Sequence, residues 1–286
     1  MEKRIVLRGV IVGAVAGVFA FVFGRIFAEP TIQAAIDYES GRDAAQDALD
    51  KAAGVATEPA GPDIFSRGIQ ANIGLGIGMI LFGAAMGALF AVAYAICVGR
   101  VGNLRPRTLS LLVALGGFLG FYLVPFVKYP ANPPAIGHAE TIRQRSALYT
   151  IMVIASIGFL ILAVMLGRRL NRRFGGWNAS LVAGGAFVVA IGILMAVLPP
   201  LGHLSANVSA YGRHATETPL PLKDANGTIV YPGFPADVLF QFRFLSVAAQ
   251  LVLWAAIGLL FAPLAERLLT PRPARATTPE SAAVSG

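Results

Sequence analysis

The chain has 286 residues, of which 56% are hydrophobic and only 13% are charged. Soluble proteins contain about 45–50% apolar and about 25% charged residues, so this composition predicts an integral membrane protein. The net charge of +8 does not indicate nucleic-acid binding, because the basic residues form short clusters beside apolar segments, where membrane topology explains them. A single cysteine excludes a disulfide framework and a CxxC metal or redox site.

Apolar segments long enough to cross a bilayer, which takes about 20 helical residues, recur along the chain. They lie near residues 9–28, 73–98, 109–127, 147–166, 180–199 and 242–263. Two long polar segments lie between them, at residues 29–67 and 200–241, and we expect the polar tail 267–286 to be disordered. Residues 1–266 are thus predicted to form an all-α, multi-pass bundle of about six transmembrane helices in the lipid bilayer of the cell inner membrane.

The first span follows a basic N-terminus, an arrangement that also occurs in signal peptides. The segment is long, however, and no A-x-A cleavage site follows it, so we expect it to be retained. Gly9, Gly13 and Gly17 repeat at four-residue spacing, which places three small residues on one helix face. This pattern predicts that another helix packs very closely there.

The first polar segment is rich in Asp and Glu. Pro30 suits the first turn of a helix, and apolar residues then recur at three-to-four spacing, so residues 31–53 are predicted to form an amphipathic helix. We expect this helix to lie on the bilayer surface or to cap the bundle. In the second polar segment, Asn226 and Gly227 between apolar pairs resemble the two-residue turn of a short β-hairpin.

The third span ends in an unusual sequence, LVPFVKYPANPP at residues 123–134. The apolar run is expected to stop at Pro125, and a lone cation follows at Lys128. Proline fixes φ and pushes the preceding residue toward extended conformations, so YPANPP is predicted to be a stiff, extended elbow. The elbow would hold its carbonyl groups and Lys128 at a defined depth.

Charges in the loops predict the orientation. Lys and Arg greatly outnumber Asp and Glu in the N-terminus, in two short loops and in the tail, whereas the two long polar segments hold most of the acids. The positive-inside rule therefore places both termini in the cytoplasm and the two long segments outside. His138, His203 and His214 fall on the outer side without H-x₃-H spacing, and we interpret them as solvated side chains.

Several charged residues lie near the outer ends of the predicted spans. Arg25 and Glu29 are four residues apart and are expected to pair along one helix face. Asp237 precedes Arg243 by six residues, and Lys128, Arg143 and Arg145 lie near other outer ends. Long basic side chains can snorkel to the interface, so position alone does not make them functional. Together, however, they could line a cavity open to the outside.

The segments FAEP, SRGIQ, LVPFVKYPANPP, TIRQRSALY and GFPADVLFQFR, with an Arg-Gly start, together resemble the proposed cobalt transporter subunit CbtA family. The resemblance covers the chain to about Leu264. It implies a multi-span protein that moves cobalt for vitamin B12 synthesis beside a small single-span subunit, CbtB, with a histidine-rich end. The family is usually described with five spans, whereas the loop charges here favour six. The matching positions are Arg8, Arg25, Glu29, Pro30, Arg67, Gln70, Lys128, Tyr129, Pro130, Asn132, Pro133, Arg143, Asp237 and Arg243.

The resemblance implies a cobalt uptake subunit rather than an enzyme. The chain contains no P-loop and no GxSxG sequence, so no ATPase of its own is expected. No permanently bound cofactor is expected, and cobalt(II) would be the substrate. Divalent cobalt prefers imidazole and carboxylate ligands, yet most matching residues are cations. The histidines could therefore come from CbtB, or the substrate could be anionic or a chelate. A membrane scaffold that only docks CbtB is a further alternative.

These residues define a predicted substrate pathway. It comprises Arg25, Glu29, Lys128, Tyr129, Asn132, Arg143, Asp237 and Arg243. Glu29 and Asp237 are the candidate metal ligands, because they are the acids in this set. We predict that both line an outer vestibule with Lys128, and that Arg25 and Arg243 keep them ionised until a divalent ion competes for the carboxylates.

Overall fold

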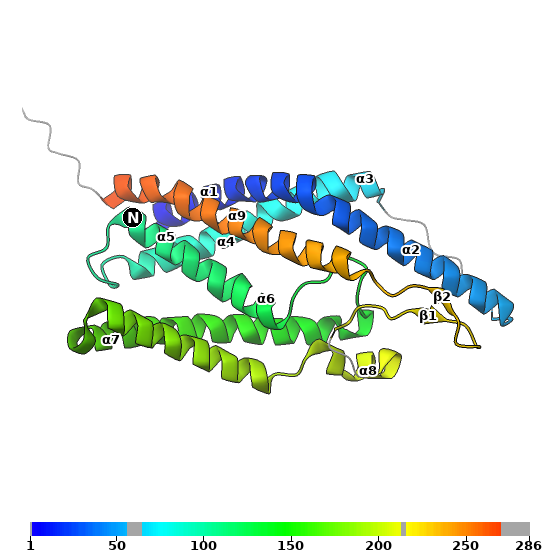
Figure 1. The fold of residues 1–286 in the computed structure, drawn as a ribbon. Helices are drawn as coiled ribbons and strands as arrows, with labels where there is room; N and C mark the ends of the chain where they lie inside the picture. The colour runs from blue at the N-terminus through cyan, green and yellow to red at the C-terminus, as the bar shows by residue number, and fades with distance from the viewer. Residues whose placement is uncertain (1, 56–64, 213–215, 270–286) are drawn as a thin grey trace, which may run out of the picture.

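The structure, a computed structural model, describes residues 2–55, 65–212 and 216–269. Within these residues, five helical segments are long and apolar enough to cross a membrane, and Figure 1 shows them running lengthwise through the molecule. They are Lys3–Ala52, Arg67–Cys97, Pro106–Lys128, Ala139–His203 and Ala236–Leu268. Every predicted span lies almost wholly within one of them, and the fourth contains two spans. Of the predicted disordered tail 267–286, residues 267–269 are instead the end of helix α9, and the rest lies outside the described residues.

Helix α7 (Ile142–Val197) is a hairpin rather than one straight rod. Gly175 has φ 72° and ψ 165°, which no residue inside an α-helix adopts, and the chain reverses there (Figure 1). A Cβ on Gly167 in the first arm would lie 3.4 Å from the Cβ of Ala183 in the second arm, so the arms pack side by side. The two arms cover the fourth and fifth predicted spans, so the fourth of the five candidate membrane-spanning segments contains both.

Helices α1 (Glu2–Phe23) and α4 (Leu75–Cys97) cross at very close range. A Cβ on Gly13 would lie 2.1 Å from the carbonyl oxygen of Gly83, and a Cβ on Gly87 would lie 2.1 Å from that of Gly9. No side chain fits at such positions, so glycines on both helices bring the two backbones into contact. The close packing predicted from the glycine spacing is confirmed.

Helices α5 (Pro106–Gly117) and α9 (Ala236–Leu269) complete the main bundle with α1 and α4. The ring of Phe261 on α9 packs edge-on against Phe90 and Tyr94 of α4, with centroids 5.1 Å apart in both pairs. The buried Ser110 hydroxyl donates to the Gly258 carbonyl at 2.8 Å and fixes α5 against α9. This core is apolar apart from a few hydroxyl groups that have backbone acceptors.

The helical path of α1 continues beyond the first predicted span. It passes through the π-helical turn η1 (Gly24–Ala28) into α2 (Glu29–Ala52) without a break, and Figure 1 shows α2 projecting past the bundle. The helix predicted at residues 31–53 is therefore present, as a direct continuation of α1, and its position relative to the bilayer stays a prediction. Pro30 starts α2 as predicted, because the wider π turn accommodates a residue that lacks an N–H donor.

The third span also continues through its proline. It consists of α5, the π-helical turn η3 (Phe118–Leu123) and α6 (Val124–Lys128), so the expected stop at Pro125 is wrong by one turn. Pro125 cannot donate to the carbonyl oxygens of Gly120 or Phe121. Hydroxyl groups of α7 approach these oxygens. The Ser156 hydroxyl lies 2.9 Å from the Gly120 oxygen and shares its proton with the Met152 carbonyl of its own helix at 2.5 Å, and Tyr149 donates to Phe121 at 3.3 Å.

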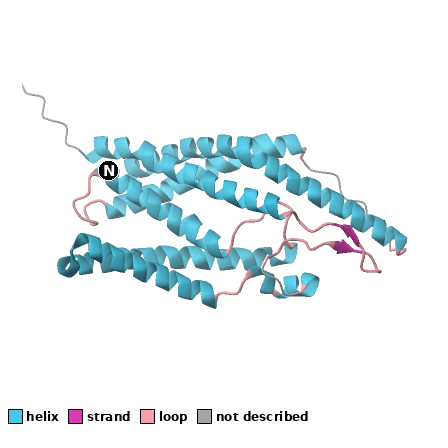
Figure 2. Ribbon diagram, viewed as in Figure 1, coloured by secondary structure: helices cyan, strands magenta, loops and turns pink. Residues whose placement is uncertain are grey.

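The second polar segment folds against α2. Strands β1 (Leu222–Lys223) and β2 (Ile229–Tyr231) pair antiparallel, and Figure 2 shows this hairpin beside the tip of α2. The predicted hairpin is present and Gly227 has φ 83°, but the loop spans residues 224–228, so the expected two-residue turn is wrong. The Tyr38 hydroxyl of α2 donates to the Pro232 carbonyl at 2.9 Å, and its ring packs on Phe234. The two polar segments therefore form one unit.

The two ends of the bundle differ in charge. We call the end formed by α2, α8 (Ser205–Tyr211) and the β-hairpin the loop end, and the opposite end the basic end. The basic end carries the start of α1, the start of α5, the turn of α7 and the end of α9 (Figure 1). Its basic residues include Lys3, Arg4, Arg8, Arg100, Arg105, Arg107, Arg168, Arg169, Arg172 and Arg173.

Candidate functional site

The proline elbow begins at the loop end directly after α6. Tyr129 leaves the helix with φ −128° and ψ 73°, and the chain stays non-helical through Pro134, as the sequence predicts. Its ring is 4% exposed, and its hydroxyl donates to the Pro199 carbonyl at 2.9 Å, at the end of the second arm of α7. Burial raises the pKa of the Tyr129 phenol, so it stays a neutral donor. The Lys128 ammonium lies 5.8 Å from the centre of the same ring.

Arg243 of α9 holds the middle of the elbow. Its guanidinium donates to the Ala131 carbonyl at 3.2 Å and to the Asn132 side-chain oxygen at 2.8 Å. Both acceptors are neutral, so the positive charge is positioned without being neutralised. The predicted pathway residues Lys128, Tyr129, Asn132 and Arg243 are thus brought together around the elbow.

Glu29 has a different partner from the one expected. It is 8% exposed and forms an ion pair with Arg67 of α3 (Arg67–Ile69), whose guanidinium also donates to Gln33 at 3.3 Å. Arg25 instead donates to the Asn72 side chain at 2.8 Å, in the π-helical turn η2 (Gln70–Gly74). The predicted Arg25–Glu29 pair is therefore wrong, because a tertiary contact outweighs a helix-surface pair that contributes only about 0.2–0.5 kcal/mol.

Two further pathway residues stand apart from these contacts. Arg143 and Asp237 are exposed and form no hydrogen bond or ion pair with any residue that the structure describes. The expected pairing of Asp237 with Arg243 is wrong, since Arg243 is engaged by the elbow. Among the described residues there is also no group of three His, Cys, Asp or Glu side chains that could hold a metal ion. A metal site with Glu29 and Asp237 stays a prediction.

A buried carboxylate that the sequence analysis missed ties the loop end together. Glu217 is 1% exposed, and one carboxylate oxygen accepts from the Thr141 hydroxyl at 2.6 Å and from the Asn207 amide at 2.7 Å. The other oxygen pairs with Arg145 at 2.9 Å. We call these four residues the Glu217 cluster. It joins the start of α7, the helix α8 and the segment before the β-hairpin. No local sequence pattern predicts these contacts.

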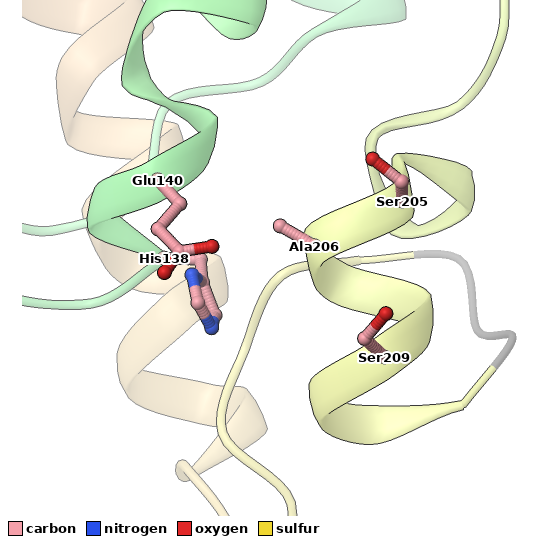
Figure 3. Close-up of a pocket in the computed structure, with 5 residues that line it drawn as sticks. All are labelled: His138, Glu140, Ser205, Ala206 and Ser209. Carbon is pink, nitrogen blue, oxygen red and sulfur yellow. The ribbon is translucent and has the colours of Figure 1, made fainter.

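A pocket of about 460 Å³ lies beside the Glu217 cluster. One wall is formed by His138, just before the short 3₁₀ helix η4 (Ala139–Thr141), and by Glu140 within it. The other wall is formed by Ser205, Ala206 and Ser209 of α8 (Figure 3). The sequence alone predicts a solvated loop side chain at His138, whereas the structure places it in this wall. The two-residue spacing between an imidazole and a carboxylate was the available signal, but it is too common to have weight alone.

Comparison with known proteins gives one match. The model of the family described as probable cobalt transporter subunit (CbtA) matches residues 2–266 of the chain. Neither the curated proteins nor the solved structures gave a match. The matched region includes every described residue of the elbow, the Glu217 cluster and the pocket.

Proposed function

Because the chain belongs to the family of probable cobalt transporter subunits (CbtA), we propose that it is the membrane subunit of a cobalt uptake transporter serving cobalamin synthesis. The family match over residues 2–266 carries this proposal. A multi-pass helical bundle suits it, because a polar substrate crosses a bilayer only through a protein interior. The protein is not an enzyme.

We place the basic end in the cytoplasm and the loop end outside. The support is the clustering of Lys and Arg at one end of the bundle and of the folded polar segments at the other (Figure 1). After Cys97→Ser removes the native thiol, single cysteines at Ser40 and at Thr228 should react with an impermeant maleimide in intact cells. Reaction only after the membrane is permeabilised would reverse the orientation.

A small histidine-rich subunit, CbtB, and an external energy source complete the proposal. The described residues contain no cluster of three metal-binding side chains, so additional ligands from another chain would strengthen cobalt binding. The sequence has no P-loop, which supports transport without an ATPase in this chain.

Uptake of radioactive cobalt into cells that carry this chain alone, the partner alone, both or neither tests the proposal. Uptake above background that requires this chain supports a transporter. A scaffold that docks CbtB predicts a different result: the partner alone, when forced to high abundance in the membrane, would take up cobalt at the rate of the pair.

One observation favours an alternative substrate. Arg25, Lys128, Arg143 and Arg243 have no carboxylate partner within ion-pair distance among the described residues. Unneutralised cations attract an anion rather than free Co²⁺. Comparing uptake of Co²⁺ with uptake of cobalt citrate distinguishes a free cation from an anionic chelate as the substrate. The chelate is preferred only if these cations bind the substrate. Lys128→Gln should then lower citrate-dependent uptake selectively.

A further inference from the structure

We infer that the pocket between η4 and α8 is a binding site for a divalent transition-metal ion, with the His138 imidazole and the Glu140 carboxylate as its protein ligands. This inference rests on the proposed function for the identity of the metal, cobalt(II). Both residues line the same pocket of about 460 Å³, which leaves room for the ion and its remaining water ligands (Figure 3). Imidazole and carboxylate together favour Co²⁺, Ni²⁺ or Zn²⁺ over Mg²⁺ or Ca²⁺.

The two walls of this pocket are held at a fixed separation. Thr141 belongs to the wall with His138 and Glu140, and Asn207 lies on α8 between Ser205 and Ser209. Both donate to the same oxygen of Glu217, at 2.6 and 2.7 Å. A single buried carboxylate therefore bridges the walls, so the pocket is preorganised rather than assembled by its ligand.

The backbone before His138 is fixed by the same cluster. Gly137 has φ 141°, and a Cβ there would lie 2.8 Å from an Arg145 nitrogen and 3.7 Å from a Glu217 oxygen. Only glycine combines this conformation with such close packing. The Thr141 backbone N–H also donates to the His138 carbonyl at 3.2 Å. His138 is thus anchored on both sides of its own Cα.

The charges of the cluster favour a cation in the pocket. Arg145 neutralises Glu217 at 2.9 Å, so Glu140 is the lining residue that contributes net charge. Ser205 and Ser209 lie four residues apart on one face of α8 and offer neutral hydroxyl oxygens to the waters of the ion. Two protein ligands with waters give moderate affinity, which suits a site that must release its ion for transport.

Calorimetric titration of the purified full-length chain in detergent with CoCl₂ tests the inference. The wild type should bind Co²⁺, and His138→Gln and Glu140→Gln should each weaken binding at least about 10-fold, since changes even in the second shell of metal sites cost 10–100-fold. The double variant should lose the site. Excess MgCl₂ should not displace Co²⁺ from the wild type.

His203→Gln is the matched control, because His203 is an exposed histidine of η5 (Leu201–His203), just before the pocket helix. It should bind Co²⁺ as the wild type does, and all variants should keep the wild-type melting temperature. Wild-type affinity in the double variant, or no binding by the wild type, overturns the inference. A different pair of results separates the two proposals. If the double variant loses Co²⁺ binding but wild-type cells take up no cobalt, the metal site stands and the proposed transport function is wrong.

Discussion

The main bundle and the α7 hairpin hold their positions by different means. In the first helical segment, 39% of the most apolar stretch is buried inside the protein, compared with 11% in the segment that contains α7. α1 and α4 touch through backbone at Gly13, Gly83 and Gly87. The hairpin instead meets the bundle through the hydroxyls of Ser156 and Tyr149 and is tied at the loop end by Tyr129 and Arg145.

Close packing and sparse polar contacts have different consequences inside a bilayer. Since lipid is as apolar as leucine, helices associate there through van der Waals contact and interhelical hydrogen bonds. The glycine crossing is a continuous contact with one stable geometry. The hairpin meets the bundle through these polar contacts and through side chains such as Ile157 against Gly120, so we expect it to shift relative to the rest more easily than α1 relative to α4.

The largest expected effect comes from filling the glycine crossing. In Gly13→Leu, the new Cβ would meet the Gly83 carbonyl at 2.1 Å, so α1 and α4 must separate, and we expect a loss of at least about 3 kcal/mol. Membrane abundance and the melting temperature in detergent measure it. Gly184→Leu on the hairpin, where the structure shows open space, should leave both unchanged. Equal damage from the two changes would contradict the comparison.

The next effect concerns the Glu217 cluster. Glu217→Gln leaves Arg145 without its counter-charge, and we expect a loss of roughly 3 kcal/mol, the lower end for a broken buried pair because Arg145 is 29% exposed. The double change Arg145→Gln with Glu217→Gln should recover most of the melting temperature. A double variant as unstable as Glu217→Gln alone would show that the hydrogen bonds, rather than the charge pair, hold the cluster.

A smaller effect separates two arginines near Glu29. Arg67→Gln removes the ion-pair partner of a carboxylate that is 11% exposed, and we expect a loss of about 2 kcal/mol, since Arg67 itself is 31% exposed. Arg25→Gln removes only the hydrogen bond to Asn72 and should cost less than about 1 kcal/mol. Thermal unfolding of both variants measures the two losses of stability. A larger loss from Arg25→Gln than from Arg67→Gln would indicate that Glu29 pairs with Arg25 instead.

The smallest effect tests the attachment of the hairpin. Ser156→Ala removes the hydroxyl that bonds to Gly120, and we expect about 0.6 kcal/mol, the average for a hydrogen bond between membrane helices. Hydrogen exchange should accelerate in η3 but not in α4. Ser180→Ala is the control, because that hydroxyl bonds only within its own helix, to Gly176. Unchanged exchange in η3 would mean that Ser156 does not attach the hairpin.

The sequence predicts this fold well where one physical signal dominates. Long apolar runs specify the spans, and the four-residue spacing of Gly9, Gly13 and Gly17 specifies the tight crossing. Prolines predict the elbow. Pro125 nevertheless stays inside a helix, because the π-helical turn η3 and a hydroxyl group of α7 compensate for its missing N–H donor. In each case the signal lies within one short segment, so the sequence of that segment alone is enough to predict the structural feature.

The contacts of the candidate site are not local. Glu217 meets Thr141 and Arg145 across more than 70 residues, and its own neighbours in sequence have no pattern that marks it as buried. Glu29 has two arginines within reach, and only the folded chain shows that the pair forms with Arg67. Charge pairing between distant segments depends on the packing of the whole loop end, which composition and periodicity do not encode.

The unbroken helical path from Lys3 to Ala52 has a mechanical consequence. Its 50 residues, at about 1.5 Å of rise each, make a rod about 75 Å long that reaches from the basic end to the tip of α2. The rod is clamped along α1 by the glycine crossing, and Tyr38 and Arg42 near its other end bond to the β-hairpin segment, so a force on that segment acts as torque about the crossing. Bending concentrates at the π turn Gly24–Ala28, because π turns are where helices yield. A displacement of the β-hairpin is therefore expected to be transmitted along α2 to this turn.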